Sequence, residues 1–463
     1  MNGHSEISKM QSDAMSSSVL YPKLDRKQLL ITGSKGLMLI AEDGTRIIDA
    51  TGGAAVACLG HNNDQVKEAI IKQLEQITYC YSQFFTTPPL EKLTQHLTES
   101  TNGEMSKVFV VSSGTEAVEA ALKMARQYFT ELPQPQYQRH RIIARRQSYH
   151  GNTLGSLAVG SHKARRALYE PMLNTQISHV SPCYPYREKI KGESDFDYVE
   201  RLAQELEDEF QRVGPDTVCA FIAETVCGGT LGCVPPVSGY FKAMREVCDR
   251  HGALLILDEV MTGMGRTGTY HAWEQEGVIP DLQTIAKCLG GGYAPIGALL
   301  VNRRVVDILN QGTKVYSHSQ TYQGHALACA TALEVQNIIK NENLVANVAA
   351  LGPYLGQLLQ KELGDHPNIG DIRGRGLFWG IEFVQDKSTK EPFPVQKQLA
   401  GNIHLAGTRK PYCISLLPGN GTADGKNGDH IILAPPYTVT KQELEEIVRR
   451  AKMVIFDVLK SID

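Results

Sequence analysis

The chain has 463 residues, enough for one large enzyme subunit with a smaller appended domain. Hydrophobic residues make up 42% and charged residues 21%, which is ordinary for a protein with a large core and excludes disordered and fibrous classes. With 47 basic and 50 acidic residues, the net charge is −3. Such a balance creates no long-range field that would gather nucleic acid or an anionic membrane, so we expect a small-molecule partner.

Cysteine usage and the N-terminal residues indicate a cytoplasmic protein. The ten cysteines form no CxxC pair, so neither a disulfide framework nor a metal site is suggested. Residues 1–18 lack the apolar core of a signal peptide and the Arg-rich character of a transit peptide, and we predict that residues 1–19 form a flexible tail. The longest apolar runs, such as residues 253–257, fall short of the roughly 20 residues that a membrane span needs.

In chain order, the first predicted elements are short β-like runs within residues 33–49, separated by glycines as in a small meander. From residue 61 onward, helices alternate with uninterrupted apolar strands. Unbroken apolar strands between helices predict a parallel sheet that is covered on both faces. The predicted strands are residues 108–111, 220–223, 254–257, 282–286 and 296–301.

One helix of this region is well delimited, because Ser238 can cap its start and Gly252 stands where a C-terminal glycine is expected. After residue 330 come a long helical stretch and β-like segments at residues 376–384 and 430–434. A last helix follows Thr440, which forms a capping box with Glu443.

These patterns predict an α/β protein. We expect a large domain over residues 61–328 with a mostly parallel central sheet covered by helices, and a smaller α+β domain from residues 20–60 and 329–463.

A candidate phosphate site follows the strand at residues 108–111. Ser113, Gly114 and Thr115 stand at the start of a predicted helix, where unpaired backbone N–H groups and the positive end of the helix dipole favour an anion. The alternative is an ordinary N-cap and tight turn. The segment is not a P-loop, because no Gly-Lys-Ser/Thr follows.

Two charged residues end buried strands. Asp258 follows the strand at residues 254–257, and Lys287 follows the strand at residues 282–286, at the edge where open α/β sheets bind ligands. Each has an ordinary explanation, a salt bridge or cap for the acid and snorkelling for the lysine. A buried lysine also has a lowered pKa, which suits Schiff-base chemistry.

Residues 263–268 match the pattern GxGxxG and follow a strand, which raises the hypothesis of a dinucleotide site. The polar residues 269–277 make a poor crossover helix, and no suitable acidic residue closes a next strand. We interpret these glycines as a turn that packs against a neighbouring element.

A phosphate cradle, a strand-end acid and a strand-end lysine thus occur in this order within one α/β body. Here the sequence resembles the class III aminotransferases, fold type I enzymes that depend on pyridoxal 5'-phosphate (PLP), from about residue 21 to the C-terminus, and most of all their omega-aminotransferase subgroup. The motifs that carry the resemblance are Ser113-Gly114-Thr115-Glu116-Ala117, Ser148-Tyr149-His150-Gly151, Ala223-Glu224-Thr225-Val226, Leu257-Asp258-Glu259-Val260, Ala286-Lys287 and Thr321-Tyr322-Gln323-Gly324-His325.

The resemblance implies a role for each motif. Lys287 would form a Schiff base with PLP and then move the proton as base and acid, while Asp258 would pair with the pyridine nitrogen. Thr321 would reach the phosphate from a second subunit, so the expected enzyme is a homodimer with shared active sites. The other cofactor-binding positions implied are Ser113, Gly114 and Thr115 at the phosphate, Tyr149 and Val260 on the ring faces, and His150 and Glu224 nearby.

The substrate site is less fully specified. Met261 replaces a glutamine that many class III members carry, and the arginine that often precedes Asp429 is absent. Lys426 or Arg409 would have to bind a substrate carboxylate in its place. Phe84 and Phe85, with Tyr149, are candidates for shaping the substrate pocket, although core packing explains the two phenylalanines equally well.

The sequence therefore predicts a transaminase that moves an amino group from an amine or omega-amino acid to a keto acid or other carbonyl acceptor. A PLP-dependent mutase or decarboxylase on the same fold is the nearest alternative. An NAD-dependent oxidoreductase that uses residues 263–268, or a catalytically silent binding protein, would be a rival from another class.

Overall fold

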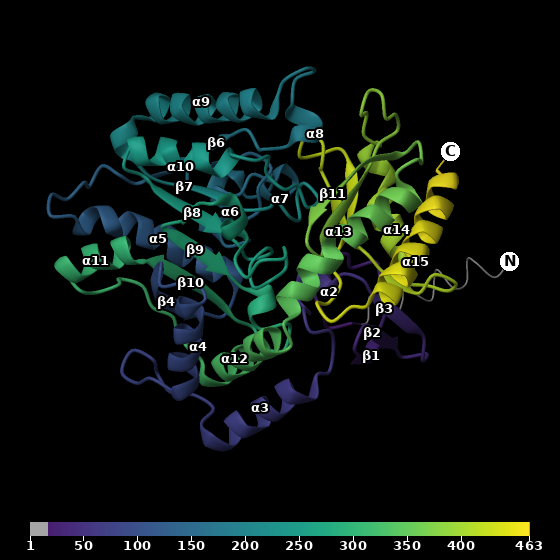
Figure 1. Ribbon diagram of the computed structural model, residues 1–463, viewed down its shortest axis with the longest axis horizontal. Helices are drawn as coiled ribbons and strands as arrows, with labels where there is room; N and C mark the ends of the chain where they lie inside the picture. The colour runs from purple at the N-terminus through teal and green to yellow at the C-terminus, as the bar shows by residue number, and fades with distance from the viewer. Residues whose placement is uncertain (1–16, 463) are drawn as a thin grey trace.

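The computed structural model describes residues 17–462, so the tail predicted for residues 1–19 lies almost wholly outside the described residues. A large sheet with its helices stands beside a smaller group of strands and helices that carries the C-terminus (Figure 1). Within the described residues, none of the helices combines the length and apolar character that crossing a bilayer requires.

Seven strands form the large sheet in the order β4-β10-β9-β8-β7-β5-β6. All residues of β7 and β8 are buried, as their apolar sequences predict. The sheet is not wholly parallel, because β10 runs antiparallel to both β4 and β9, whereas the pairs from β9 to β6 are parallel. The strands are β4 (Met105–Val111), β5 (Arg141–Arg145), β6 (Ile177–Val180), β7 (Val218–Glu224), β8 (Leu254–Asp258), β9 (Leu282–Ile285) and β10 (Gly297–Asn302).

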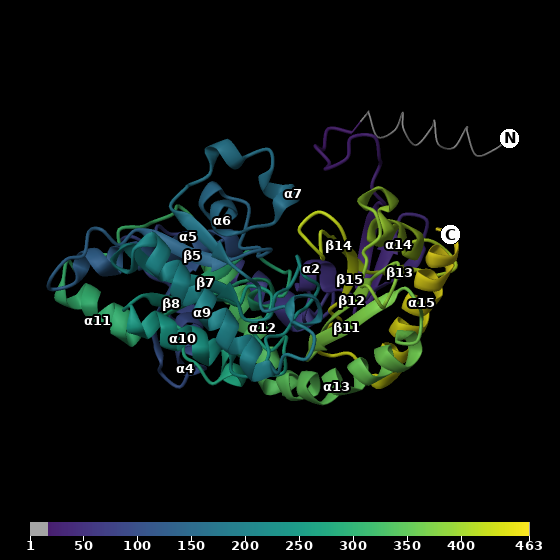
Figure 2. The ribbon, with the colours of Figure 1, turned by 90° about the horizontal axis from the view of Figure 1, so that it is seen from above.

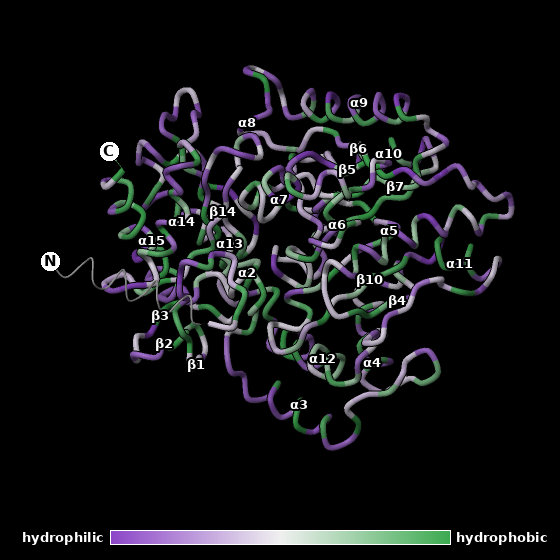
Figure 3. Tube along the Cα trace, turned by 180° about the vertical axis from the view of Figure 1, so that it is seen from behind, coloured by the Kyte–Doolittle hydropathy of each residue, from purple (hydrophilic) through white to green (hydrophobic). Residues whose placement is uncertain are grey.

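Helices cover both faces of this sheet, which confirms the predicted α/β class. Successive residues of β8 belong to different cores, since Leu255 packs with α9 and α10 while Leu254 packs with α5 and α11. Hydrophobic residues concentrate in the central strands and on the helix faces turned toward them (Figure 3). The helices are α3 (Asp64–Gln76), α4 (Pro88–Glu99), α5 (Gly114–Glu131), α6 (Leu154–Val159), α7 (Lys163–Arg166), α8 (Pro185–Glu188), α9 (Asp195–Val213), α10 (Tyr240–Arg250), α11 (Arg303–Gln311) and α12 (Ala326–Asn341).

The limits of α10 correct one prediction. Gly239, not Ser238, is its N-cap residue, and no side chain caps this helix. The predicted C-terminal glycine is confirmed, because Gly252 has a φ of 62° just beyond the last turn.

Both ends of the chain contribute to two smaller sheets. The predicted N-terminal meander is confirmed as β1 (Ile31–Lys35), β2 (Met38–Ala41) and β3 (Arg46–Asp49), and β13 (Ile414–Ser415) pairs with β3. The second sheet has the order β11-β12-β15-β14. Its strands and the helices of this region are β11 (Ile369–Arg375), β12 (Phe378–Phe383), β14 (Leu417–Asn420), β15 (Asp429–Leu433), α2 (Gly52–Ala55), α13 (Leu344–Leu363), α14 (Leu399–Gly407) and α15 (Lys441–Lys460).

The capping box at the start of α15 is confirmed, because Thr440 and Glu443 cap each other's backbone N–H. The boundary predicted after residue 328 falls inside α12. The division into two domains at residues 61 and 329 stays a prediction.

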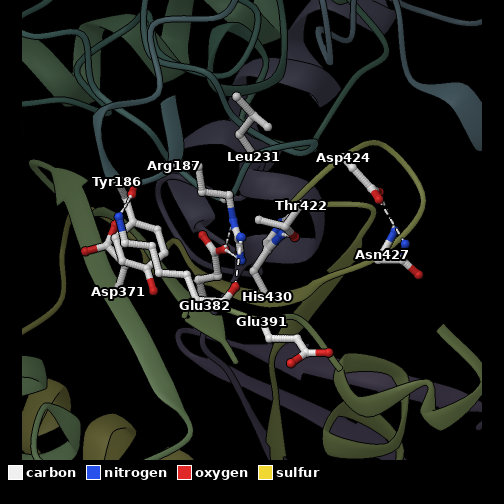
Figure 4. A network of polar contacts seen from close by, with 12 residues as sticks. Tyr186, Arg187, Leu231, Asp371, Glu382, Glu391, Thr422, Asp424, Asn427 and His430 are labelled. Carbon is white, nitrogen blue, oxygen red and sulfur yellow. Dashed lines mark hydrogen bonds and ion pairs between the residues drawn. The ribbon is translucent and has the colours of Figure 1, made fainter. Parts of the chain in front are cut away.

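A buried ion network joins the segment before α9 to the C-terminal sheet (Figure 4). Glu382 on β12 is fully buried, and its carboxylate contacts the guanidinium groups of Arg187 at 2.5 Å and Arg373 at 2.6 Å. Tyr184 also donates a hydrogen bond to Glu382. Since a buried carboxylate left without its cations is strongly destabilising, this network fixes the approach of the two parts of the chain.

Candidate active site

A cavity of about 380 Å³ opens at the carboxyl ends of β7 and β8 and at the start of α5. This is the edge at which parallel α/β sheets bind ligands. The cavity brings together nine of the positions that the sequence analysis singled out: Ser113, Gly114, Thr115, Tyr149, His150, Glu224, Asp258, Val260 and Lys287.

The start of α5 forms the part of the cavity suited to an anion. Ser113 is the N-cap residue, and its hydroxyl accepts a hydrogen bond from the Glu116 amide at 3.3 Å. Gly114 has to be glycine, because a Cβ there would lie 2.8 Å from Cγ1 of Val260. The backbone amides of the first residues of this 18-residue helix, Gly114 and Thr115, have no acceptor within the helix, and both residues line the cavity. A phosphate group therefore fits here.

Asp258 is held rigidly at the end of β8. The residue is only 4% exposed. One carboxylate oxygen lies 2.7 Å from Nδ1 of His150, and the other accepts a hydrogen bond from the Val260 amide at 3.0 Å. His150 and Asp258 thus act as a unit, in which the histidine orients the carboxylate.

Lys287 follows β9 with a strained backbone. Its φ of 42° lies in the left-handed region that residues other than glycine rarely adopt. Its carbonyl accepts hydrogen bonds from the amides of Gly290 and Gly291, which hold this conformation. Burial lowers the pKa of the Lys287 ammonium, although the negative charge of Asp258 opposes the effect. A lowered pKa increases the fraction of neutral, nucleophilic amine.

Glu224 at the end of β7 holds backbone at the cavity wall. Its carboxylate accepts hydrogen bonds from the amide of Tyr149 at 3.2 Å and from the amide of Gly228 at 2.9 Å. The glutamate therefore positions Tyr149, and its side chain forms an ion pair with no arginine among residues 17–462.

Four predicted site residues do not line this cavity: Phe84, Phe85, Thr321 and Lys426. Phe84 is 76% and Phe85 is 64% exposed, which excludes core packing within this chain as their explanation. Tyr79 donates a hydrogen bond to the carbonyl of Thr321, so the segments that carry the phenylalanines and Thr321 lie together.

Lys426 lies in a loop that satisfies its own hydrogen bonds. Asp424 accepts bonds from the amides of Lys426 and Asn427, each at 2.7 Å, and the Thr422 hydroxyl lies 2.6 Å from Nδ1 of His430 (Figure 4). The Lys426 side chain is exposed, as is Arg409. Neither residue lines the cavity.

The structure also shows lining residues that the sequence analysis missed. Asn152 and Thr262 line the cavity, and the Thr262 hydroxyl is buried without a hydrogen-bond partner. Asn152 directly follows the motif at residues 148–151, which is the signal that would have found it. Thr262 has no comparable signal.

The glycines of residues 263–268 pack against another helix, which confirms their interpretation as a structural turn. A Cβ on Gly265 would lie 3.1 Å from the side chain of Val345, and one on Gly268 would lie 3.3 Å from the backbone of Ala349, both on α13. The turn leads into a short 3₁₀ helix, Ala272–Glu276, and not into a crossover helix.

An amine at one strand end, a buried carboxylate at the next and an anion-binding helix start define the class of α/β enzymes that use PLP. The three groups match its aldehyde, its ring nitrogen and its phosphate. Gly114 allows the start of α5 to approach Val260 closely at the cavity wall, because a side chain at this position would collide with Val260.

Comparison with known proteins identifies the family. The profile "Aminotransferase class-III" matches residues 21–455. An aminotransferase of Gibberella zeae is 52% identical over 437 residues, covering 94% of this chain and 85% of that protein. Gamma aminobutyrate transaminase 2 of Solanum lycopersicum is 33% identical over 446 residues, covering 95% and 94%. The crystal structure of a thermostable (S)-enantioselective omega-transaminase from Thermomicrobium roseum, 33% identical, matches with a TM-score of 0.89 over 99% of both chains.

The chain therefore belongs to the class III aminotransferase family, and it is a PLP-dependent aminotransferase of fold type I. The mutase, decarboxylase and oxidoreductase alternatives are not favoured.

Proposed function

We propose that this protein is a homodimeric transaminase for terminal amines and omega-amino acids, with Lys287 as the residue that attaches the cofactor. The observation that carries the proposal is the meeting of Lys287, the Asp258–His150 pair and the start of α5 in one cavity. When bound, PLP supplies a ring that accepts the electrons released as a C–H bond of the substrate breaks.

The residues of the chain divide the remaining work. The amides at the start of α5 and the hydroxyls of Ser113 and Thr115 bind the phosphate. Asp258, oriented by His150, keeps a proton on the ring nitrogen. Lys287 is the cofactor attachment point, and its Nζ takes the proton from the substrate carbon and later returns it.

The lining of the cavity supports the choice of donor. Apart from Lys287, no lysine or arginine is among the described residues that line it. A carboxylate on the carbon that bears the amino group would therefore enter the cavity without a cation, which is costly. The omega-transaminase and the gamma aminobutyrate transaminase among the similar proteins agree with a donor whose amino group is terminal.

We expect the holoenzyme to transfer amino groups from 4-aminobutyrate and butylamine with a kcat/KM at least about tenfold above that for 2-aminobutyrate, the loss expected for a poorly paired carboxylate. With pyruvate as the acceptor, the measurement is the formation of alanine and of the carbonyl product of each donor, an aldehyde from 4-aminobutyrate and butylamine and a keto acid from 2-aminobutyrate. Equal amounts of the two products support transamination. Release of carbon dioxide, or a rearranged amine without a carbonyl product, would instead identify a decarboxylase or a mutase.

An exposed aromatic surface supports the homodimer. Phe84, Phe85, Tyr79 and Tyr322 are between 39% and 76% exposed, and the rings of Tyr79 and Tyr322 lie 6.0 Å apart. We refer to these four residues as the aromatic surface. A gathering of exposed aromatic rings marks an interface, and Thr321 stands next to it in the chain. Burial against a second copy would carry Thr321 and the two phenylalanines to the partner's cavity.

Replacing Tyr322 with glutamate is expected to dissociate the dimer and to abolish most activity. Light scattering coupled to size-exclusion chromatography should give a mass of two 51.0 kDa chains for the native protein and of one chain for Tyr322→Glu. Phe196→Glu is the matched control, because Phe196 is 71% exposed on α9, away from the aromatic surface. A native protein that is active as a monomer would refute the shared site.

The cytoplasm is the proposed compartment. All ten cysteines are free thiols in the structure, and nine of them are buried. Free thiols persist in reducing compartments. Fractionation that recovers the protein from a secretory compartment would contradict this proposal.

A further inference from the structure

A second cavity, of about 470 Å³, adjoins the wall of the active site. We call it the side cavity. Its described lining comes from the start of α7, β14, the first residues of α14 and the start of β15, and Figure 2 shows α7 facing β14 across this part of the molecule. The charged or titratable residues of its lining are Lys23, His162, Arg165 and Asp429.

Arg165 connects the two cavities. Its guanidinium carbon lies 4.9 Å from the centre of the Tyr149 ring, and Tyr149 lines the active-site cavity together with Lys287. A guanidinium over an aromatic face is held in place by the ring while its N–H groups remain free at the edges. Arg165 is therefore placed beside the substrate space, in contact with Tyr149 of its wall.

The guanidinium of Arg165 is not committed to any other group of the described chain. Among residues 17–462 it forms no hydrogen bond and no ion pair. The adjacent Arg166 differs, because it pairs with Glu170 and donates to the carbonyls of Ala158 and Gly160. Five N–H donors of Arg165 are thus available to an incoming acceptor.

The one carboxylate among the described residues of the side cavity, that of Asp429, forms no ion pair with Arg165. The carboxylate of Asp429 accepts a hydrogen bond from the Ala400 amide at 3.0 Å, and burial raises its pKa. His162 is 8% exposed, and its Nδ1 is buried without a hydrogen-bond partner. A polar ligand that enters the cavity therefore finds the uncommitted guanidinium of Arg165.

We propose that Arg165 binds the remote carboxylate of omega-amino acid substrates, in the space between Tyr149 and the side cavity. This inference rests on the proposed omega-amine function. The guanidinium offers the planar, paired donors that fit a carboxylate. The amino group of such a substrate reacts at Lys287 while its carboxylate lies beyond Tyr149, so the carboxylate never has to enter the active-site cavity.

The decisive experiment compares two donors of similar length, 4-aminobutyrate and butylamine, on the holoenzyme of the native protein, Arg165→Ala and Arg165→Lys. We expect Arg165→Ala to lower kcat/KM for 4-aminobutyrate by about 10- to 100-fold, mainly through KM, because a charge-assisted hydrogen bond is lost. In the same variant, kcat/KM for butylamine should fall by less than about threefold. Arg165→Lys should recover part of the loss, since an ammonium is a point charge without the planar fork.

A binding measurement that needs no turnover completes the test. Butyrate should inhibit the native enzyme against 4-aminobutyrate, and its inhibition constant should rise about tenfold in Arg165→Ala. Arg46→Ala, which removes an exposed arginine of β3, is the matched control and should match the native protein.

Three outcomes would overturn the proposal. The first is an equal loss for both donors in Arg165→Ala, which would mean that Arg165 acts by positioning Tyr149. The second is an unchanged kcat/KM for 4-aminobutyrate. The third is a selective loss in Lys426→Ala or Arg409→Ala in place of Arg165→Ala. A native enzyme that does not use 4-aminobutyrate at all would refute the proposed donor class instead.

Discussion

Replacing Lys287 with alanine is expected to lower kcat by about 10⁴-fold or more, because one side chain serves as both attachment point and proton carrier. The geometry supports the size of the effect. Lys287 is the one lysine among the described residues that line the active-site cavity, so no other amine of this lining can substitute for it. Steady-state transamination of 4-aminobutyrate or butylamine measures the loss.

Lys287→Arg separates the amine chemistry from the positive charge. Arginine keeps the charge but does not lose its proton, so it should be as inactive as Lys287→Ala. Lys92→Ala, at an exposed position on α4, is the control that should keep native activity. Borohydride reduction should add the cofactor mass to the peptide that contains residue 287 in the native protein and not in either variant. Labelling of another lysine would refute the assignment.

The large sheet could be predicted from the sequence because strands that are buried on both faces consist of continuous runs of apolar residues. Residues 254–257 and 282–286 are continuous apolar runs, and they became β8 and β9. The direction of β10 was not predictable in this way, since a strand buried on both faces has the same composition whether it runs parallel or antiparallel. Strand β5 was missed because its three apolar residues are flanked by two charged residues, Arg141 and Arg145. Arg145 is nevertheless buried in the structure, where its guanidinium donates a hydrogen bond to the carbonyl of Glu224.

The site residues that end predicted strands could be found from the sequence. The contacts that folding forms between distant residues could not. Asp258 and Lys287 end neighbouring strands, so topology alone places them at one edge. The contact of His150 with Asp258 joins residues 108 positions apart, and the family motif, not any local pattern, pointed to His150. Arg165 had no signal at all, because only the turn of α7 brings its guanidinium over Tyr149.

Replacing Asp258 with asparagine is the second change for which we expect a large effect, a fall in kcat of about 10² to 10⁴-fold. Asparagine keeps the shape and can still accept the hydrogen bond from the Val260 amide. It lacks the negative charge that keeps a proton on the ring nitrogen, so the electrons of the breaking C–H bond lose their acceptor. The exchange of the substrate's C–H hydrogen for solvent deuterium, measured by NMR, should slow in proportion to kcat.

Glu259→Gln is the matched control for this experiment, because Glu259 is the next residue and is equally buried but does not line the cavity. Its carboxylate accepts hydrogen bonds from the amides of Ala272 and Trp273, at 2.8 and 2.7 Å. Burial raises the pKa of Glu259 to about 7, so Glu259→Gln removes a charge that is only partly present near neutral pH. We expect kcat within about threefold of native, with any effect confined to the thermal midpoint. A loss in Glu259→Gln as large as in Asp258→Asn would show that distortion of the strand end, and not the charge of Asp258, limits the reaction.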